Sequence, residues 1–211
     1  MTDVEELAAG ATALGVALDG VQIGRLASFA HLLRRWNSAF NLVSRRDIRR
    51  IVARHLLDSL SLSSMLHGPR VLDLGTGAGL PGVPLAIARP SLHFTLVDRR
   101  ERRIRFVRQA CMELELSNVD AIAADFTSFR ATTPFDTVVS RAVAKPASVW
   151  RVAASLLAAD GVALLQVGAA EGTDLDVDAN AHVESIRIPG IEQPQHIMTI
   201  RRAKSPAQAE E

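Results

Sequence analysis

A glycine-rich segment that directly follows a short apolar run has the composition of a ligand-binding turn. It reads Val-Leu-Asp-Leu-Gly-Thr-Gly-Ala-Gly-Leu over residues 71–80. Glycines at the carboxyl end of a strand let the backbone approach a ligand closely, although a plain strand-to-helix turn can have the same composition. Leu80 stands where a dinucleotide fingerprint has its third glycine, and Pro81 and Pro84 lack amide donors that a pyrophosphate would use. The segment therefore favours a bound ligand other than a dinucleotide.

An acidic residue, Asp98, ends the next apolar run and stands 19 residues after Gly79. A carboxylate at this place is suited to the hydroxyl groups of a ribose, because ligands bind outside the carboxyl ends of the strands in such sheets. The glycine turn and the acid together predict a cofactor that contains a ribose.

Short apolar runs alternate with helical patterns around these two features. Strands are predicted at 70–74, 92–97, 119–124, 135–140 and 161–167. Helices are predicted at 81–89, 101–115 and 146–158. Two further strands, 182–188 and 196–201, have no helical pattern between them, so one edge pair of the sheet is expected to be antiparallel. The pattern predicts a doubly wound α/β fold with a mostly parallel, seven-stranded sheet.

Three stretches of the chain differ in their pattern. Residues 1–68 are expected to form an N-terminal helical extension, because apolar residues recur at helical spacing on both sides of a loop at 37–46. Residues 69–203 are predicted to form the ligand-binding domain. Residues 204–211 are predicted to be a polar tail with frayed structure.

Composition excludes several classes of protein. The chain has 211 residues, 48% of them hydrophobic, which is enough for a substantial core. It contains no apolar run long enough to span a membrane, and its first residues are acidic rather than basic and apolar. The single cysteine, Cys111, can form no internal disulfide and lacks neighbours with metal-ligand spacing. We expect a cytoplasmic protein without a metal or a membrane partner.

Arginines are concentrated in two clusters, although the net charge is only +1. Between residues 25 and 54 the only acid is Asp47, and between 99 and 108 the only acid is Glu101. The first cluster contains Arg25, Arg34, Arg35, Arg45, Arg46, Arg49, Arg50 and Arg54. The second contains Arg99, Arg100, Arg102, Arg103, Arg105 and Arg108. Either cluster alone could be a solvated helix face, but the two together favour a phosphate-bearing partner, because the guanidinium matches phosphate oxygens.

Several motifs along nearly the whole chain resemble the ribosomal small-subunit methyltransferase G family, also called glucose-inhibited division protein B. They are Arg35-Trp36-Asn37, Arg54-His55-Leu56-Leu57-Asp58-Ser59, Gly79-Leu80-Pro81-Gly82 and Ser140-Arg141-Ala142. The resemblance implies a class I, Rossmann-like methyltransferase that uses S-adenosylmethionine. It also implies that the substrate is the N7 atom of one guanine in 16S ribosomal RNA, with the small ribosomal subunit as the partner.

The resemblance also implies roles for individual residues. Cofactor contacts are expected from Asp73, Gly75, Gly77, Leu80, Asp98, Phe126, Thr127 and Arg141. Substrate contacts are expected from Arg54, His55 and Lys145. Two structural alternatives stay open: Arg141 could pair with Asp136 or Asp73, and His55 could form an interior pair with Asp58. Val167 and Gln195 stand where relatives usually carry a Lys and an Arg, and Lys145 could supply the missing charge.

The end of the fourth predicted strand, Val138-Val139-Ser140-Arg141-Ala142, lacks groups that other methyl transfers use. It has no Asn or Asp followed by Pro-Pro-aromatic, which is typical of amino-nitrogen methylation, and no Pro-Cys for covalent attack on a pyrimidine. Guanine N7 has a free lone pair and needs no general base, so no catalytic residue is predicted. A small-molecule methyltransferase of the same fold and a non-catalytic RNA-binding or nucleotide-binding module remain the alternatives.

Overall fold

The computed structural model describes residues 2–141, 144–168 and 179–202. Ala142, which belongs to one of the motifs above, and the tail predicted at 204–211 lie outside the described residues.

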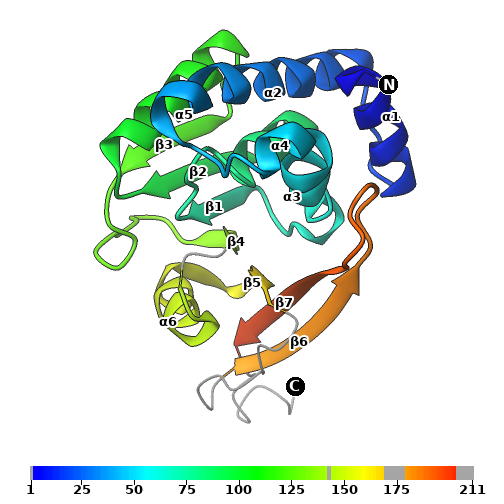
Figure 1. Cartoon of the computed structure of the whole chain (residues 1–211). Helices are drawn as coiled ribbons and strands as arrows, with labels where there is room; N and C mark the ends of the chain where they lie inside the picture. Colours follow the sequence, from blue (N-terminus) through cyan, green and yellow to red (C-terminus); the bar gives the residue numbers. More distant parts are fainter. Residues whose placement is uncertain (1, 142–143, 169–178, 203–211) are drawn as a thin grey trace.

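A seven-stranded sheet forms the centre of the fold, as predicted (Figure 1). Its strands are β1 (Arg70–Leu74), β2 (His93–Asp98), β3 (Val119–Ala123), β4 (Phe135–Arg141), β5 (Leu157–Val167), β6 (Ala179–Ile186) and β7 (Gln195–Arg202). The spatial order is β3-β2-β1-β4-β5-β7-β6. Strands β1 to β5 pair in parallel, whereas β7 runs antiparallel to both β5 and β6. The order reverses between β1 and β4, which is where open sheets of this kind bind ligands.

Helices cover the two faces of the sheet unequally. The described helical segments are α1 (Asp3–Ala13), α2 (Gly20–Phe40), η1 (Asp47–Arg50), η2 (Val52–Leu57), α3 (Asp58–Leu60), η3 (Ser63–Met65), α4 (Gly82–Ala88), α5 (Glu101–Glu113) and α6 (Pro146–Leu156). Alternate residues of a strand point to opposite faces. Val71 accordingly belongs to the hydrophobic cluster that contains residues of α2, η2, α4 and α5, whereas Leu72 belongs to the cluster that contains residues of α6. The N-terminal segments therefore share one hydrophobic core with the sheet. The domain division after residue 68 stays a prediction.

Long-range contacts attach the N-terminal helices to this core. The side-chain amide of Gln22 in α2 donates hydrogen bonds to the carbonyl oxygens of Ile87 and Ala88, at 3.0 and 3.2 Å. The ring of Phe29 stacks on that of Phe106 in α5, with centroids 6.2 Å apart. These contacts hold the segment after α2 beside the carboxyl edge of the sheet.

Two boundaries differ by four residues from the sequence-based expectation. The loop predicted at 37–46 begins later, because α2 continues to Phe40 and ends at Asn41, which adopts a left-handed backbone conformation (φ 46°). The fifth strand begins at Leu157 rather than at residue 161. Leu157 already pairs with Phe135, and a register shift between Phe135 and Thr137 accommodates the extra residues.

Candidate active site

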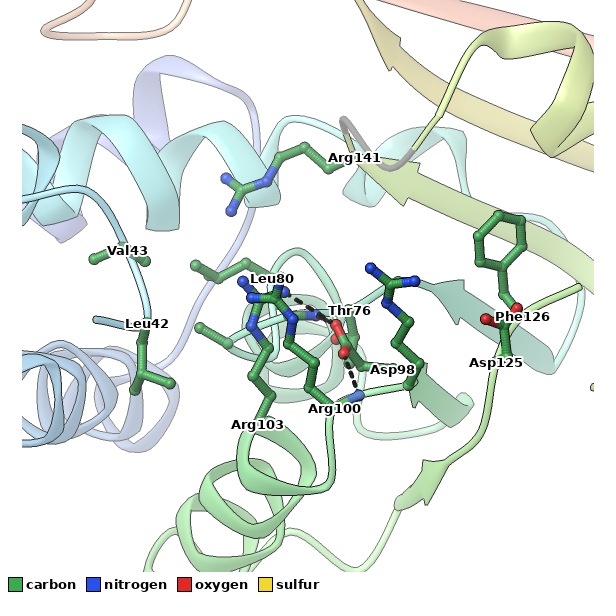
Figure 2. A pocket seen from close by; sticks show the side chains of 14 residues that line it. Leu42, Val43, Thr76, Leu80, Asp98, Arg100, Arg103, Asp125, Phe126 and Arg141 are labelled. Carbon is green, nitrogen blue, oxygen red and sulfur yellow. Dashed lines mark hydrogen bonds and ion pairs between the residues drawn. The ribbon is translucent and has the colours of Figure 1, made fainter. Parts of the chain in front are cut away.

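A cavity of about 440 Å³ opens at the carboxyl ends of β1 and β2. Six of the eight residues predicted to contact a cofactor line it: Gly75, Gly77, Leu80, Asp98, Phe126 and Arg141. Figure 2 shows Leu42 and Val43 on one side of this cavity and Asp125 and Phe126 on the other, with Arg141 between the two sides. We call it the first pocket.

The turn after β1 is attached to β2 through its backbone. The amides of Gly75 and Thr76 both donate to the carbonyl oxygen of Val97, at 2.8 and 3.0 Å. Gly77 has a φ of 59°, and a Cβ atom there would lie 3.5 Å from the Arg103 guanidinium, in the space of the first pocket. Gly79 (φ 81°) has a different role, because its Cβ atom would lie 2.7 Å from the Val83 side chain. Gly77 thus keeps the pocket open, and Gly79 allows close packing under the turn.

Asp98 is held at the end of β2 by three donors. Its Oδ1 atom accepts from the Arg100 amide at 2.8 Å, and its Oδ2 atom accepts from the Gly77 amide at 3.0 Å and from Arg103 Nη1 at 3.2 Å. A carboxylate offers about four acceptor positions, so one remains on Oδ1. The acid predicted from sequence therefore faces the pocket in a fixed orientation.

Asp73 lies beneath the turn and does not line the pocket. Its side chain is fully buried, and Oδ2 accepts from the Gly82 amide at 2.9 Å. Burial raises the pKa of Asp73 to about 6, and the hydrogen bond from the Gly82 amide partly opposes this rise. A Cβ atom on Gly82 would lie 2.8 Å from that oxygen, so glycine is required for the contact. Asp73 therefore fixes the turn from beneath and is not among the residues that line the pocket.

The loop after β3 brings Asp125 and Phe126 to the pocket, whereas Thr127 is not part of its lining. The Thr127 amide and hydroxyl both donate to Asp125 Oδ1, at 2.9 and 2.7 Å. These bonds hold the pKa of the Asp125 carboxyl below its ordinary value. Sequence reasoning missed Asp125, although an acid directly after the strand predicted at 119–124 is a recognisable signal. It also missed Leu42 and Val43, which come from a distant part of the chain.

Arg141, the last residue of β4, is held by the N-terminal segment rather than by the sheet. Its Nη1 atom donates to His55 Nδ1 at 3.2 Å and to Asp58 Oδ2 at 3.4 Å, and Gln166 Nε2 donates to Asp58 Oδ1 at 3.1 Å. The ion pair is therefore with Asp58, not with Asp136 or Asp73 as the structural alternative assumed. Within the described residues, no hydrogen bond joins His55 to Asp58, and both contact Arg141 instead.

Burial shifts the pKa values of His55 and Asp58, the two partners of Arg141, in opposite directions. It lowers the pKa of His55 to about 4, and the charge of Arg141 lowers it further. It raises the pKa of Asp58, and Arg141 and Gln166 oppose that rise. The imidazole is therefore neutral near pH 7 and accepts the Arg141 hydrogen bond at Nδ1, which places its proton on the buried Nε2 atom.

A second cavity, of about 260 Å³, lies on the other side of Arg141, and we call it the second pocket. Asp58 and Gln166 line it, as do Val167 and Gln195, the two positions at which the family resemblance leads us to expect basic residues. Of the predicted substrate residues, Lys145 is exposed between two residues that line this pocket, Ala144 and Pro146. Arg54 is partly exposed in η2, and His55 is buried behind Arg141.

Intramolecular ion pairs divide the first arginine cluster into two parts. Arg34 pairs with Asp3, and Arg35 pairs with Glu113 at 3.1 Å. Arg45, Arg46 and Arg49 are exposed and form no ion pair with any acid in the described ranges, and the first two follow the pocket-lining Val43 closely in the sequence. Arg45, Arg46 and Arg49 are therefore available to an external partner, and Arg99 and Arg100 line the first pocket.

Within the described residues, no group of His, Cys, Asp and Glu could hold a metal ion. Cys111 is buried, and burial raises the pKa of its thiol to about 12, so it is not a nucleophile at neutral pH. The described lining of both pockets contains neither His nor Cys. None of the described helices combines the length and apolar composition needed to cross a membrane.

Comparison with known proteins decides the family of this chain. A sequence model of the rRNA small subunit methyltransferase G family matches residues 22–197. The chain belongs to the rRNA small subunit methyltransferase G family. The protein of this family from Methylococcus capsulatus is 44% identical over 195 residues, covering 91% of this chain and 95% of the relative. The one from Chromohalobacter salexigens is 40% identical over 201 residues, covering 93% and 96%.

Solved structures of other methyltransferases match the fold of this methyltransferase G family member, although their sequences are only distantly similar to it. The O-methyltransferase TomG from Streptomyces achromogenes matches with a TM-score of 0.58 and 16% identity, covering 90% of this chain and 92% of TomG. A SAM-dependent methyltransferase from Aquifex aeolicus matches with a TM-score of 0.54 and 14% identity, covering 72% and 92%. These likenesses establish the class I methyltransferase fold.

Proposed function

We propose that this chain transfers a methyl group from S-adenosylmethionine to the N7 atom of a guanine in 16S ribosomal RNA. Family membership supports an RNA substrate in the small ribosomal subunit. The observation that carries the chemistry is the pair of pockets that meet at Arg141, neither with a His or Cys in its described lining.

The first pocket fits the cofactor. Gly77 leaves open a space that any side chain would fill, and Asp98 retains an acceptor position for a ribose hydroxyl. Gly75, Leu80 and Phe126 complete the contact surface, Arg141 borders it, and Asp73 positions the turn from beneath. Thr127 contributes by fixing Asp125, through the two hydrogen bonds described above. When bound, S-adenosylmethionine supplies an electrophilic methyl group on a sulfonium.

Proton transfer is not required of the protein in this reaction. Guanine N7 carries its lone pair at neutral pH and loses no proton on methylation. Holding the two reactants in line at short distance can supply most of the rate enhancement. The N7 edge lies in a deep, narrow groove of paired RNA, so the target guanine must be unpaired or held open. Arg54 and Lys145, together with the exposed arginines after Val43, are proposed to contact the RNA in the cytoplasm.

The decisive experiment uses small ribosomal subunits from a strain that lacks this enzyme. They are incubated with the purified protein and S-adenosylmethionine that carries a labelled methyl group, and the label is mapped by nuclease digestion and mass spectrometry. We expect a single 7-methylguanine in 16S rRNA and a single-turnover rate that is flat between about pH 6.5 and 8.5. Label on an amino nitrogen or a ring carbon would contradict the mechanism. Thermal stabilisation by S-adenosylmethionine without any labelled RNA would instead favour a small-molecule substrate.

A further inference from the structure

The second pocket has walls of two kinds. Asp58 and Arg141 contribute charged groups on the side that faces the first pocket, while Pro146, Val149 and Leu165 contribute apolar surface. Flipped bases are held in this way in enzymes that act on nucleic acids, with apolar contacts on the ring and hydrogen bonds at its edge. A volume of about 260 Å³ accommodates a single purine ring.

The Asp58 carboxylate is fixed from two directions. Gln166 donates to Oδ1 at 3.1 Å, and Arg141 donates to Oδ2 at 3.4 Å, so each oxygen retains an acceptor position. The side chain is 6% exposed, and the Gln166 Oε1 atom beside it is buried without a hydrogen-bond partner. A ligand with two adjacent N–H donors would occupy the free acceptor positions of the carboxylate.

The order of polar groups around the two pockets matches the order of atoms around guanine. From the first pocket the protein presents Arg141, which borders both cavities, and then Asp58, which borders only the second. Around the base, N7 is followed by the O6 acceptor and then by the N1–H and N2–H donors. A guanine whose N7 atom faces the first pocket therefore places O6 at Arg141 and its two donors at Asp58.

We propose that the second pocket binds the target guanine and that Asp58 reads its N1–H and N2–H groups while Arg141 contacts O6. The proposal rests on the function proposed above and makes Asp58 a specificity-determining residue. Adenine is rejected, because it presents an N–H donor to Arg141 and a lone pair to Asp58. A pyrimidine offers no N7 atom at the first pocket. Since the N1–H and N2–H groups form the Watson–Crick edge, recognition requires an unpaired guanine.

The protein-side test compares Asp58→Asn with the exposed control Asp160→Asn, using the labelled-subunit assay. We expect Asp58→Asn to reduce kcat/KM for small subunits on the order of 10- to 100-fold, because it loses charged recognition of the guanine edge. Its affinity for S-adenosylhomocysteine, measured by calorimetry, should stay within about 3-fold of the parent, which would show that the first pocket is intact. An unchanged kcat/KM for Asp58→Asn would overturn the proposal.

The base-side test uses the unmodified protein, so it does not depend on whether the variant folds. After the modified position has been mapped, a 16S rRNA fragment is made with guanine or with inosine at that position. Inosine keeps N7, O6 and N1–H but lacks the N2 amino group. With S-adenosylhomocysteine present, the dissociation constant should be roughly 5- to 10-fold weaker for inosine. Equal affinities would overturn the assignment of Asp58, whereas absence of labelled guanine in the parent assay would overturn the proposed function itself.

Discussion

The two pockets on either side of Arg141 differ in where their walls come from. The first pocket is built mainly from the glycine turn of residues 75–80 and from the end of β2, which follow one another in the sequence. The second is built from Asp58, Arg141, Gln166 and Gln195, which lie in four separate segments. A site made of consecutive backbone is visible as a motif. A site made of side chains from distant segments becomes visible only when the sheet brings those segments together.

At each pocket, burial shifts the pKa of a supporting residue, and the two shifts have opposite directions. Asp73 supports the turn of the first pocket, and burial raises its pKa to about 6. His55 supports Arg141, and burial lowers its pKa to about 4. The difference follows from charge, since desolvation disfavours the anionic form of a carboxyl and the cationic form of an imidazole.

The largest effect is expected at the first pocket, from Gly77→Val. A side chain there fills the cofactor space, so we expect the affinity for S-adenosylmethionine to fall by roughly 100-fold or more in calorimetry. The left-handed φ of 59° adds a stability cost of about 1–2 kcal/mol. Gly24→Ala is the matched control, because nothing lies within 4 Å of its Cβ position. If Gly77→Val bound the cofactor normally, the first pocket would not be the cofactor site.

Arg141→Ala tests the boundary between the two pockets, because this side chain lines both of them. Turnover on small subunits should fall by roughly 10- to 100-fold, a graded loss of positioning rather than the loss of a nucleophile. Removing the cation leaves Asp58 buried with Gln166 as its hydrogen-bonding partner, so urea unfolding should show a loss of about 2–3 kcal/mol. Arg141→Lys should recover part of the stability but little of the turnover, since one ammonium cannot reproduce the planar guanidinium. Unchanged turnover in Arg141→Ala would remove this residue from the reaction.

The pH dependence of stability distinguishes the contribution of Asp73 from that of His55. For Asp73, the folded pKa is raised from 3.8 to about 6, so its contribution to stability is present below pH 4 and is lost as pH rises through 6. For His55, the folded pKa is lowered from 6.5 to about 4, so its contribution is present above pH 6.5 and is lost as pH falls through 4. Each amounts to about 3 kcal/mol, and in the parent protein the two largely offset each other between pH 4 and 6.

Single substitutions should expose the two contributions. With Asp73→Asn, the free energy of unfolding should rise by about 3 kcal/mol between pH 4 and 6.5, because the Asp73 contribution no longer offsets that of His55. With His55→Gln, it should fall by a similar amount from pH 4 to 6. Urea titrations at each pH measure both slopes. Parallel pH profiles for the two variants would show that these groups are not buried as described.

The smallest effect concerns the arginines around the first pocket. Replacing both Arg45 and Arg46 with Ala should reduce the salt dependence of 16S rRNA binding, lowering the slope of log K against log salt by about 1–2. Replacing both Arg34 and Arg35 should change the slope less, because these two already pair with Asp3 and Glu113. Filter binding at several salt concentrations gives the slopes. A larger change in slope for the variant at Arg34 and Arg35 would contradict our assignment of Arg45 and Arg46 as the arginines available to RNA.

Much of the fold could be predicted from the sequence because its signals are local. The strand predicted at 70–74 matches β1, and the antiparallel strands near the carboxyl end are present as β6 and β7. The stretch around residues 48–60 is less regular than its helical spacing indicates, since it consists of a 3-10 turn, a π-helical turn and one short α-helical turn. Apolar periodicity predicts which side of a segment is buried but not how its backbone hydrogen bonds are arranged.

For this protein, the sequence alone determined the strand alternation, the glycine turn and Asp98, because each depends on residues close together in the chain. Tertiary structure alone decided that Arg141 pairs with Asp58, that Arg34 and Arg35 are neutralised, and that a second pocket exists. Hydrogen bonds and ion pairs act over a few ångströms in space, whatever the separation in sequence. Asp58 and Gln166 are 108 residues apart, and only the docking of the N-terminal helices on the sheet makes them neighbours.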